Sequence, residues 1–421
     1  MAQIKEFKGM MYDSDIVGDI SSVVAPHCHA SEEETICNFY ANHPFNVVRL
    51  EYPITEDENK YEQTDEAVKN WLDTGILKVD DAPAIYIYEQ EYFVFNEIKT
   101  IRGIICKVKM DVDTVIPHEN TNTDLYDTYK SDRYNLMMAT GCSFCSVYSL
   151  YKDEDKKVSA LLETRNAPDI EFTDDCEVTH RIWSIKDENK IAEIKEAFLN
   201  KKVIIADGHV RYATAQRYRE KMKNDVVEFS GNEDFNYVMM NLMPITYDKP
   251  TILPVHRIVK NRQNFDENVF IEKISENFTV EKSYIREYDC EKIATRLKEN
   301  KINRSIGLYC GKDYYYILTP KEIINAKTDA DMLQDYIFAK ILGINKDNFD
   351  TYIGYTNTIK ESEQMVREGG ANCAFYLNPM STDELYSMAL CGECTPKRST
   401  RFYPKLTIGI IMNKFEDYKE G

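Results

Sequence analysis

The sequence predicts an α/β protein with mixed β-sheets. The spacing of its apolar residues indicates this fold class, and its length indicates more than one domain. Short apolar or alternating runs, which are typical of strands, recur between longer segments that have the spacing of amphipathic helices. At 421 residues, with 43% hydrophobic and 12% aromatic residues, the chain is globular and too long for one small core. We therefore expect two or three domains in which strands and helices alternate.

Two helices are predicted near the start of the chain. The first begins at a capping box that joins Ser31 to Glu34, and it runs to about Ala41. The second ends at Gly75 and carries its apolar residues on one face. These apolar residues are Ala67, Val68, Trp71 and Leu72.

The middle of the chain contains the longest predicted strands. Residues 84–95 and 101–110 indicate two strands that form a hairpin. The elements that follow are a polar stretch at 117–132, a helix around 134–139, a helix at 191–199, and buried strands at 203–206 and 236–245.

The stretch VIIADGHVRYATAQRY, residues 203–218, changes abruptly from strand to helix. Asp207-Gly208 is a turn signal, and an Asp carboxylate is a good cap for the helix that we expect from His209 onward. The free N–H groups at a helix N-terminus favour an anion, usually a phosphate. The alternative is an ordinary capped helix with a surface arginine, Arg211.

Three domain-sized segments are predicted. Residues 1–261 form an N-terminal and catalytic core, and residues 262–345 form a smaller inserted α/β unit of two helices and three strands. Residues 346–421 form a C-terminal α/β segment that returns a basic loop to the core. In this last segment, one helix ends at Gly369-Gly370 and another is capped by Ser381.

The charge of the chain argues against several classes of partner. The net charge is −19 and the pI is near 5.0, so the overall field repels nucleic acid and anionic membranes. The first residues, MAQIKEFKGM, have no apolar signal sequence, and no stretch approaches the length that spans a bilayer. We expect a cytoplasmic protein whose partners are small molecules.

Eleven cysteines are scattered along the chain, and we expect free thiols. The CxxC pairs Cys142/Cys145 and Cys391/Cys394 offer four thiolates for a zinc ion. However, the first pair lies in a predicted strand, where residues three apart face opposite sides. We therefore do not predict zinc.

Two polar clusters in the N-terminal half are candidate chemistry. In HPFNVVRL, a predicted strand at 43–50, Asn46 and Arg49 bracket two valines, and an arginine on a buried strand needs an anion or a carboxylate. In VIPHENT, His118 and Glu119 follow a strand end and suit a general base or a metal contact. The alternative for VIPHENT is a solvated loop.

The segment CTPKRSTRFYPK, residues 394–405, is unusually basic for so acidic a chain. Guanidinium groups and hydroxyls are the groups that hold phosphate oxygens, although a solvated basic loop is the alternative. The chain has no GxxxxGK[ST] and no GxGxxG motif, so a bound phosphate would need an unusual cradle. The candidate residues in this segment are Lys397, Arg398, Ser399, Thr400, Arg401 and Lys405.

Nearly end to end, the chain resembles a family of uncharacterised proteins whose hallmark is a strand followed by ADGHHRY. That element is similar to the phosphate-binding loop of free serine kinases, which share a fold with ParB and sulfiredoxin. The resemblance therefore implies a ParB/sulfiredoxin-like phosphate-binding core. The segments that carry the resemblance are DIVGDISSVVAP, HPFNVVRL, YEQEY, VIPHENT, IADGHVRYATA, LPVHRIV and the closing ST-x-FYPK.

The resemblance carries over to individual residues. Asp207, Gly208, His209 and Arg211 match the loop, whereas Val210 stands where the family has its second histidine. Other matches are His118, Glu119 and Thr121 of the PHExT element, the Asp132-Arg133 pair, and Ser399, Thr400, Phe402, Pro404 and Lys405 of the closing element, where Arg398 replaces a lysine.

This resemblance implies a phosphotransferase that converts free L-serine to O-phospho-L-serine with Mg²⁺. Inorganic pyrophosphate is the expected donor, with ATP or ADP as alternatives, because nucleotide motifs are missing. A phosphatase acting on phosphoserine and a non-catalytic ParB-like anion binder are the alternative functions.

The implied roles are as follows. Glu119 accepts the serine proton, with Glu32 and Asp19 as rivals, and His118, His209 and Asp207 complete the catalytic set. Asp207 also caps the helix or contacts the metal. Phosphate is held by Gly208, His209, Arg211, Arg398, Ser399, Thr400 and Lys405, and the serine by Asn46, Arg49 and Arg133.

Overall fold

The computed structural model describes residues 2–27, 33–54, 59–118, 124–164, 166–225, 229–247, 249–284, 290–345 and 347–416. The chain folds into two units. The first unit comprises residues 1–251, 386–394 and 404–421, and the second comprises 252–385 and 395–403. The polypeptide therefore passes between the units four times.

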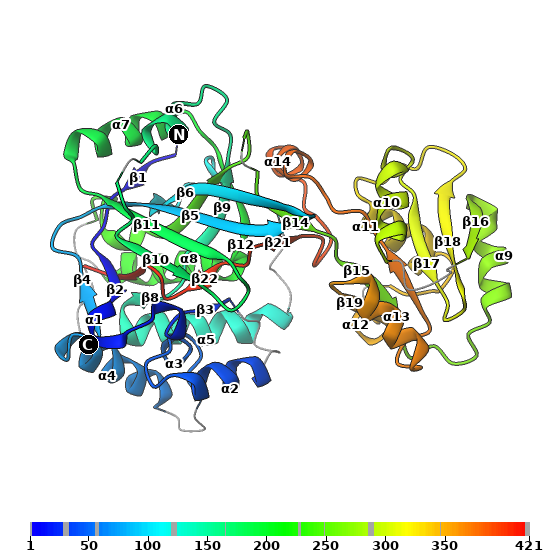
Figure 1. The fold of residues 1–421 in the computed structure, drawn as a ribbon, viewed down its shortest axis with the longest axis horizontal. Coiled ribbons are helices and arrows are strands. Elements are labelled where there is room, and N and C mark those ends of the chain that lie inside the picture. Colours follow the sequence, from blue (N-terminus) through cyan, green and yellow to red (C-terminus); the bar gives the residue numbers. More distant parts are fainter. Residues whose placement is uncertain are drawn as a thin grey trace. The chain divides into compact units, whose positions relative to one another are not determined.

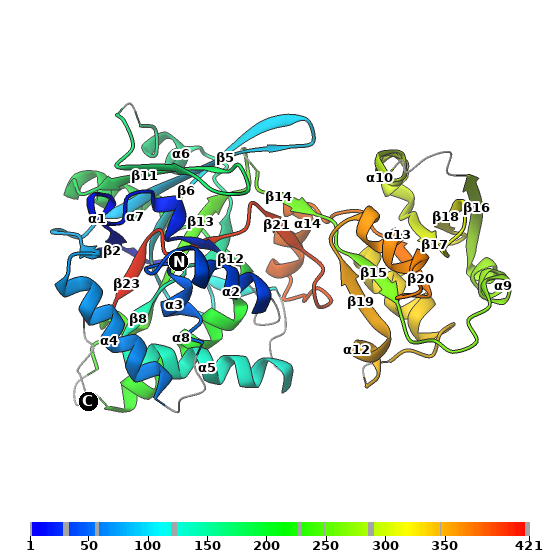
Figure 2. The ribbon, with the colours of Figure 1, turned by 60° about the horizontal axis from the view of Figure 1, so that its bottom comes forward.

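A nine-stranded mixed sheet forms the centre of the first unit (Figure 1), as the α/β pattern predicts. The predicted hairpin is confirmed, because β5 (Ile85–Val94) and β6 (Glu97–Lys109) pair in antiparallel register. Its far end extends past the neighbouring strands (Figure 2). The strand order is β10 (Ile170–Thr173), β11 (Thr179–Ile185), β5, β6, β13 (Tyr237–Pro244), β9 (Val147–Tyr151), β12 (Val203–Asp207) and β7 (Val115–Pro117), with β1 (Ile4–Lys5) beside β6.

One face of this sheet carries the main apolar core of the first unit. Alternate residues of the strands, such as Val203 and Ile205, point into this core. Ile194 and Phe198 of α7 (Glu188–Phe198) and Tyr212 of α8 (His209–Asp225) cover it. α6 (Lys157–Leu161) contributes Val158 and Leu161.

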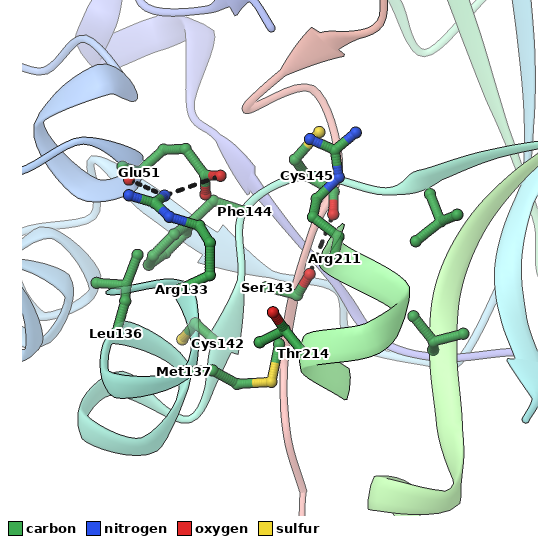
Figure 3. A pocket seen from close by; sticks show the side chains of 12 residues that line it. Glu51, Arg133, Leu136, Met137, Cys142, Ser143, Phe144, Cys145, Arg211 and Thr214 are labelled. Atoms are coloured by element: carbon green, nitrogen blue, oxygen red, sulfur yellow. Dashed lines mark hydrogen bonds and ion pairs between the residues drawn. The ribbon is translucent and has the colours of Figure 1, made fainter. Parts of the chain in front are cut away.

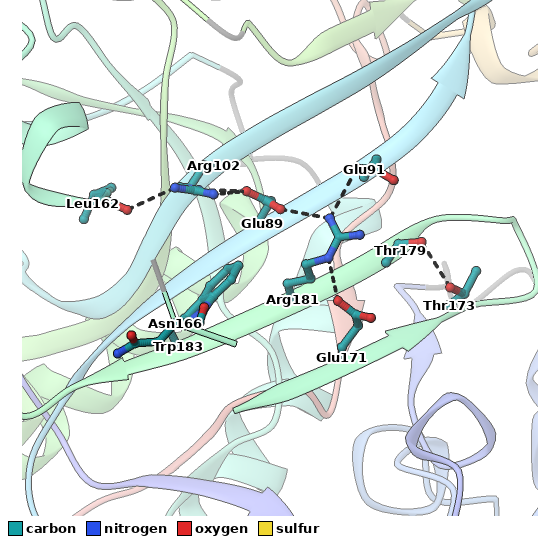
Figure 4. A network of polar contacts seen from close by, with 10 residues as sticks. All are labelled: Glu89, Glu91, Arg102, Leu162, Asn166, Glu171, Thr173, Thr179, Arg181 and Trp183. Carbon is teal, nitrogen blue, oxygen red and sulfur yellow. Dashed lines mark hydrogen bonds and ion pairs between the residues drawn. The ribbon is translucent and has the colours of Figure 1, made fainter. Parts of the chain in front are cut away.

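Charged residues continue this face of the sheet beyond the apolar core (Figure 4). Glu89 in β5 accepts hydrogen bonds from Arg102 in β6 and, at 3.0 Å, from Arg181 in β11. Arg181 also donates to Glu171 in β10 at 2.7 Å. These ion pairs link four adjacent strands and support their register.

Smaller elements complete the first unit. Near the chain ends, a four-stranded sheet has the order β4 (Leu77–Val79), β2 (Gly9–Tyr12), β23 (Met412–Lys414) and β8 (Cys142–Ser143), while β3 (Ala25–Pro26) pairs with β22 (Thr407–Ile408). The helices are α1 (Ser14–Val17), α2 (Glu33–Asn42), α3 (Val48–Glu51), α4 (Lys60–Asp73) and α5 (Asp124–Thr140). In the described part of the chain, every helix is too short or too polar to span a bilayer.

The first unit also contains a buried ion pair. Nζ of Lys107 in β6 lies 2.6 Å from Oδ1 of Asp234, and both side chains are 2% exposed. Burial lowers the pKa of Lys107, and the Asp234 carboxylate opposes that shift.

The predicted strand at 43–50 is wrong, because residues 48–51 form helix α3. The Asn46 side chain explains the difference. Its Oδ1 accepts a hydrogen bond from the Val48 N–H, and its Nδ2 donates to the carbonyls of Ser22 and Val24. These contacts stabilise a turn at a point where the local valines favour a strand.

The second unit contains a six-stranded sheet with an apolar cluster on each face. It is larger than the predicted insertion at 262–345, because β15 pairs with strands from the segment after it. The strand order is β16 (Phe278–Tyr284), β18 (Tyr314–Pro320), β17 (Ile306–Tyr309), β20 (Cys373–Tyr376), β15 (His256–Val259) and β19 (Ile353–Thr356).

The second unit contains the predicted helices and, among the described residues, two four-residue helices that were not predicted. The helix that ends before Gly369-Gly370 is confirmed as α13 (Ile359–Arg367). The others are α9 (Glu267–Asn277), α10 (Cys290–Glu299), α11 (Asp329–Met332) and α12 (Phe349–Tyr352). α14 (Thr382–Leu390) continues from this unit into the first, and the strands β14 (Thr251–Leu253) and β21 (Arg401–Tyr403) pair with each other.

Candidate functional site

The turn between β12 and α8 has the predicted strand–turn–helix form. The pairing of β12 with β9 shifts between Ile205 and Asp207, so the strand ends in a bulge. The Asp207 carboxylate accepts the N–H of Gly208 at 2.6 Å, and Gly208 has a φ of +91°. The first N–H groups of α8 have no intrahelical acceptor, so the helix presents its positive end at the turn.

The Arg211 side chain folds back over this turn. A Cβ atom built on Gly208 would lie 2.9 Å from Nη2 of Arg211 and 3.1 Å from its Nε. The left-handed backbone favours glycine at residue 208, and a Cβ there would require the guanidinium to shift from its position. The result is a row of helix N-terminal amides with a guanidinium beside it, which is an arrangement suited to a phosphate.

Two histidines lie side by side next to this turn. The rings of His118 and His209 are 4.6 Å apart at a steep angle, and the His118 N–H donates to Nε2 of His209 at 3.3 Å. Nδ1 of His118 lies 2.5 Å from the carbonyl oxygen of Ile205. Because a carbonyl only accepts, Nδ1 of His118 carries the proton and its Nε2 keeps a lone pair.

Both histidines are neutral at pH 7. Burial lowers the pKa of His118 to about 4, against the opposing effects of the Ile205 carbonyl and Asp207. Burial, followed by electrostatic interactions with His118 and Arg211, lowers the pKa of His209 well below its ordinary value. In this state each imidazole offers one donor and one acceptor.

A small cavity lies behind Arg211 (Figure 3). Its volume is about 30 Å³, which is room for a water molecule. Arg133 and Glu51 line one side, with Nη1 of Arg133 3.1 Å from Oε1 of Glu51, and Arg211 lies beside Cys145 on the other. Burial raises the pKa of Cys145 to about 12, so its thiol stays protonated. The hydroxyl of Thr214 also lines the cavity and has no hydrogen-bond partner among the described residues.

A polar row crosses three strands from the turn toward the sheet centre. Asp207 in β12 is opposite Tyr148 in β9, and Tyr148 is level with Asn241 in β13. Met240 and Leu242 point into the apolar core, so Asn241 points to the other face. Its side chain is fully buried, yet neither Nδ2 nor Oδ1 forms a hydrogen bond within the described ranges.

Sequence reasoning missed Asn241. An asparagine in the middle of the apolar run YVMMNLMP was the available indication. Buried amides are normally hydrogen-bonded, so an amide without a partner on a buried sheet face is a candidate ligand contact.

A model of the DUF1015 family, described as proteins of unknown function, matches residues 4–341. The chain belongs to this family. No curated protein sequence matches it significantly.

Several solved structures are similar to this DUF1015 protein at low identity, and three of them follow. A free serine kinase in complex with AMP is 14% identical with a TM-score of 0.36, covering 70% of this chain and 86% of its own. A conserved hypothetical protein from Pyrococcus furiosus is 13% identical with a TM-score of 0.34, covering 71% and 92%. SbnI from Staphylococcus aureus with a C-terminal truncation is 11% identical with a TM-score of 0.33, covering 72% and 84%.

In this DUF1015 chain, the residues predicted to hold the serine have structural partners of their own. Asn46 is fully buried and holds the turn before α3. Arg49 lies over the Tyr40 ring at 4.5 Å and donates to the Tyr40 carbonyl at 2.6 Å. Arg133 forms ion pairs with Glu51 and, at 2.6 Å, with Asp132.

The predicted acid–base residues have different outcomes. His118 lies beside His209, as described above. Asp19 caps a short turn by accepting the Ser21 N–H at 2.9 Å. Glu119 and its rival Glu32 lie outside the described residues.

The residues of segment 394–405 that were predicted to hold phosphate are divided between the two units. Lys405 belongs to the first unit, whereas Arg398, Ser399 and Thr400 belong to the second. The Arg398 guanidinium lies over the Tyr355 ring at 4.9 Å, and the Ser399 hydroxyl donates to the Pro396 carbonyl at 2.6 Å.

The residues at the turn fit a Mg²⁺ ion that arrives with phosphate. Mg²⁺ keeps several waters and usually binds to one or two carboxylates together with phosphate oxygens. Asp207 is exposed at the turn and would supply one such carboxylate. Within the described ranges, no three His, Cys, Asp or Glu side chains are grouped closely enough to hold a metal by themselves.

Proposed function

We propose that this protein is a phosphotransferase that phosphorylates free L-serine to O-phospho-L-serine, with inorganic pyrophosphate as donor. The observation that carries the proposal is the Gly208–Arg211 arrangement, in which a guanidinium lies against the N-terminal turn of α8. The resemblance of ADGHVRY to the phosphate-binding loop of free serine kinases supports the same assignment.

Phosphoryl transfer mainly requires positioning and charge neutralisation. The amides of Gly208 and His209 and the Arg211 guanidinium would hold the phosphoryl group. Asp207 would hold a Mg²⁺ ion shared with the donor, and this ion would neutralise phosphate charge. The polar row that ends at Asn241 would bind the amino acid.

The serine oxygen forms a bond to the transferred phosphorus while the bridging P–O bond of pyrophosphate breaks and inorganic phosphate leaves. The serine hydroxyl must lose its proton in this step. In this proposal the Glu119 carboxylate accepts the serine hydroxyl proton. Glu119 directly follows His118 in the sequence. His118 and His209 are neutral, so they would serve as hydrogen-bonding groups that position phosphate or serine, without adding positive charge. Arg133 or Arg49 would bind the serine carboxylate only by exchanging part of its contacts with Glu51 and Asp132 or with Tyr40.

³¹P NMR of the protein with Mg²⁺, L-serine and one donor per tube tests the function. We expect phosphoserine in the pyrophosphate tube. If phosphoserine forms only with ATP or ADP, that nucleotide is the donor and pyrophosphate is not. Phosphoserine in no tube would refute the serine kinase. Release of phosphate from phosphoserine would then identify a phosphatase.

A pair of arginine variants on the same helix tests the site. We expect Arg211→Met to lower the rate by about 100-fold or more, because it removes charge from the phosphate cradle. Arg217→Met is the matched control, since Arg217 is exposed on α8 and lies over the Tyr134 ring at 4.1 Å. Equal effects of the two substitutions would contradict the proposed site.

A further inference from the structure

The second unit contains a buried arginine that binds backbone carbonyls. Arg257 lies in β15 and is 3% exposed. Its Nη1 donates to the Val255 carbonyl at 2.9 Å. Its Nη2 donates to the carbonyls of Arg398 at 3.0 Å and Lys397 at 3.4 Å. Arg257 therefore attaches the basic segment 396–401 to the sheet of the second unit.

This attachment fixes an unusual backbone conformation. Arg398 has a φ of +55°, in the left-handed region that non-glycine residues rarely adopt. Such a conformation persists when surrounding contacts hold it. The hydrogen bond from Arg257 to the Arg398 carbonyl is one such contact, and the bond from the Ser399 hydroxyl to the Pro396 carbonyl closes the same turn.

The turn places a second guanidinium over the same tyrosine ring as the first. Arg257 lies 4.6 Å and Arg398 4.9 Å from the centre of the Tyr355 ring in β19. The positive charges of the two guanidiniums repel each other, and an anion bound nearby would offset this repulsion. Neither forms an ion pair with a carboxylate in the described part of the chain, and the nearby Asp350 pairs with Lys397 at 3.4 Å.

Positive charge is therefore concentrated at this turn. Arg257 cannot itself present its donors to a ligand, since carbonyls occupy both of its terminal nitrogens. Arg398 is less buried and has the tyrosine ring as its support. A guanidinium stacked on a ring keeps its planar set of donors for an oxyanion.

We propose that residues 396–401 of the second unit form an oxyanion-binding loop, in which Arg398 and Lys397 bind phosphate oxygens and Arg257 is the positioning residue. The loop, its arginine anchor and its tyrosine support all belong to the second unit, so this unit holds the site without residues from the first. The choice of a phosphate group as the anion rests on the proposed function.

Binding measurements on the full chain test the proposal without turnover. Isothermal titration with pyrophosphate, and separately with inorganic phosphate, needs no serine. We expect Arg398→Met to weaken pyrophosphate binding by about tenfold or more, because it removes a charge-assisted contact. Arg262→Met is the control, since Arg262 also lies over a tyrosine of this unit, Tyr352 at 5.2 Å. Weakening that appears only with inorganic phosphate would identify free phosphate as the ligand.

Arg257→Lys tests the positioning role. It keeps the charge but cannot reach several carbonyls at once, so we expect weaker pyrophosphate binding together with faster hydrogen–deuterium exchange in residues 396–401. Exchange in β17 and β20 serves as the measure of intact folding. Unchanged exchange in the loop would overturn the role of Arg257.

The two proposals fail in different ways. If Arg398→Met binds pyrophosphate as tightly as the natural protein while phosphoserine forms normally, the loop proposal is wrong and the proposed function stands. If pyrophosphate binding depends on Arg398 but no phosphoserine forms with any donor, the proposed function is wrong and the loop remains.

Discussion

The guanidinium of Arg211 occupies the space in which a side chain on Gly208 would begin. The conformation of each residue therefore depends on the other. The glycine provides the left-handed turn and the empty volume, and the arginine three positions later fills that volume with charge. The proposed anion site at this turn requires both residues.

Gly208→Ala should lower the rate of phosphoserine formation. The new Cβ must displace Arg211, and the backbone strain at φ +91° should cost about 1–2 kcal/mol of stability. Gly231→Ala is the control, because Gly231 has a φ of +81° but a Cβ added there would meet no described atom within 4 Å. We expect similar losses of stability in urea unfolding and a loss of activity only at residue 208. Full activity in Gly208→Ala would exclude the steric argument.

Acid should destabilise the protein through the histidine pair. The pKa of His118 is lowered to about 4 in the folded state from an ordinary 6.5, so the unfolded state binds more protons between these values. The stabilisation is fully present above pH 6.5 and is lost as the pH falls toward 4. We expect a loss of about 2 kcal/mol from His118 between pH 7.5 and 5.

Urea unfolding of His118→Gln at these two pH values measures that contribution. The variant should depend less on pH than the natural protein. Equal pH dependence in the variant and in the natural protein would show that His118 is not the group responsible.

Asn241→Leu should make the protein more stable and less active. It removes two buried polar atoms that have no hydrogen bond within the described residues, which should add about 1 kcal/mol to the free energy of unfolding. The same change removes the amide that we assign to ligand contact. Thermal unfolding and the KM for serine are the two measurements.

Asn236→Leu is the contrasting variant. Asn236 is 3% exposed, but its Nδ2 donates to Glu233 Oε2 at 2.9 Å. Its replacement should destabilise the protein. A stabilised Asn241→Leu with an unchanged KM would remove Asn241 from the site.

Asp234→Asn should be strongly destabilising. The ammonium of Lys107 would stay buried without its counter-charge, at a cost of about 3–5 kcal/mol. Asp225→Asn breaks the exposed pair between Lys221 and Asp225 on α8 and should leave the urea midpoint unchanged. Equal, small effects would mean that Lys107 loses its proton or gains water when the carboxylate is removed.

Local sequence patterns predicted the elements whose causes are local. The strand–turn–helix at 203–218 and the β5–β6 hairpin follow from patterns within a few residues, and both are confirmed. HPFNVVRL failed because Asn46 bonds to carbonyls more than twenty residues earlier. The spacing of apolar residues within a segment does not indicate a hydrogen bond to a distant part of the chain.

The site was predicted in part for the same reason. The Gly208–Arg211 turn is a continuous motif, so it was visible in the sequence. Asn241 and Arg257 owe their importance to strand neighbours and to a loop about 140 residues away. The ParB/sulfiredoxin-like core, the donor and the proton acceptor stay predictions.

The four passages of the chain between the units limit how the protein can be divided. A protease that cuts at one passage leaves at least one fragment that contains residues of both units, so a single cut does not release the two units as separate fragments. A gene fragment that encodes 252–385 lacks the nine residues 395–403, which include Arg398. A stop codon after residue 385 would therefore remove parts of both units with a single deletion.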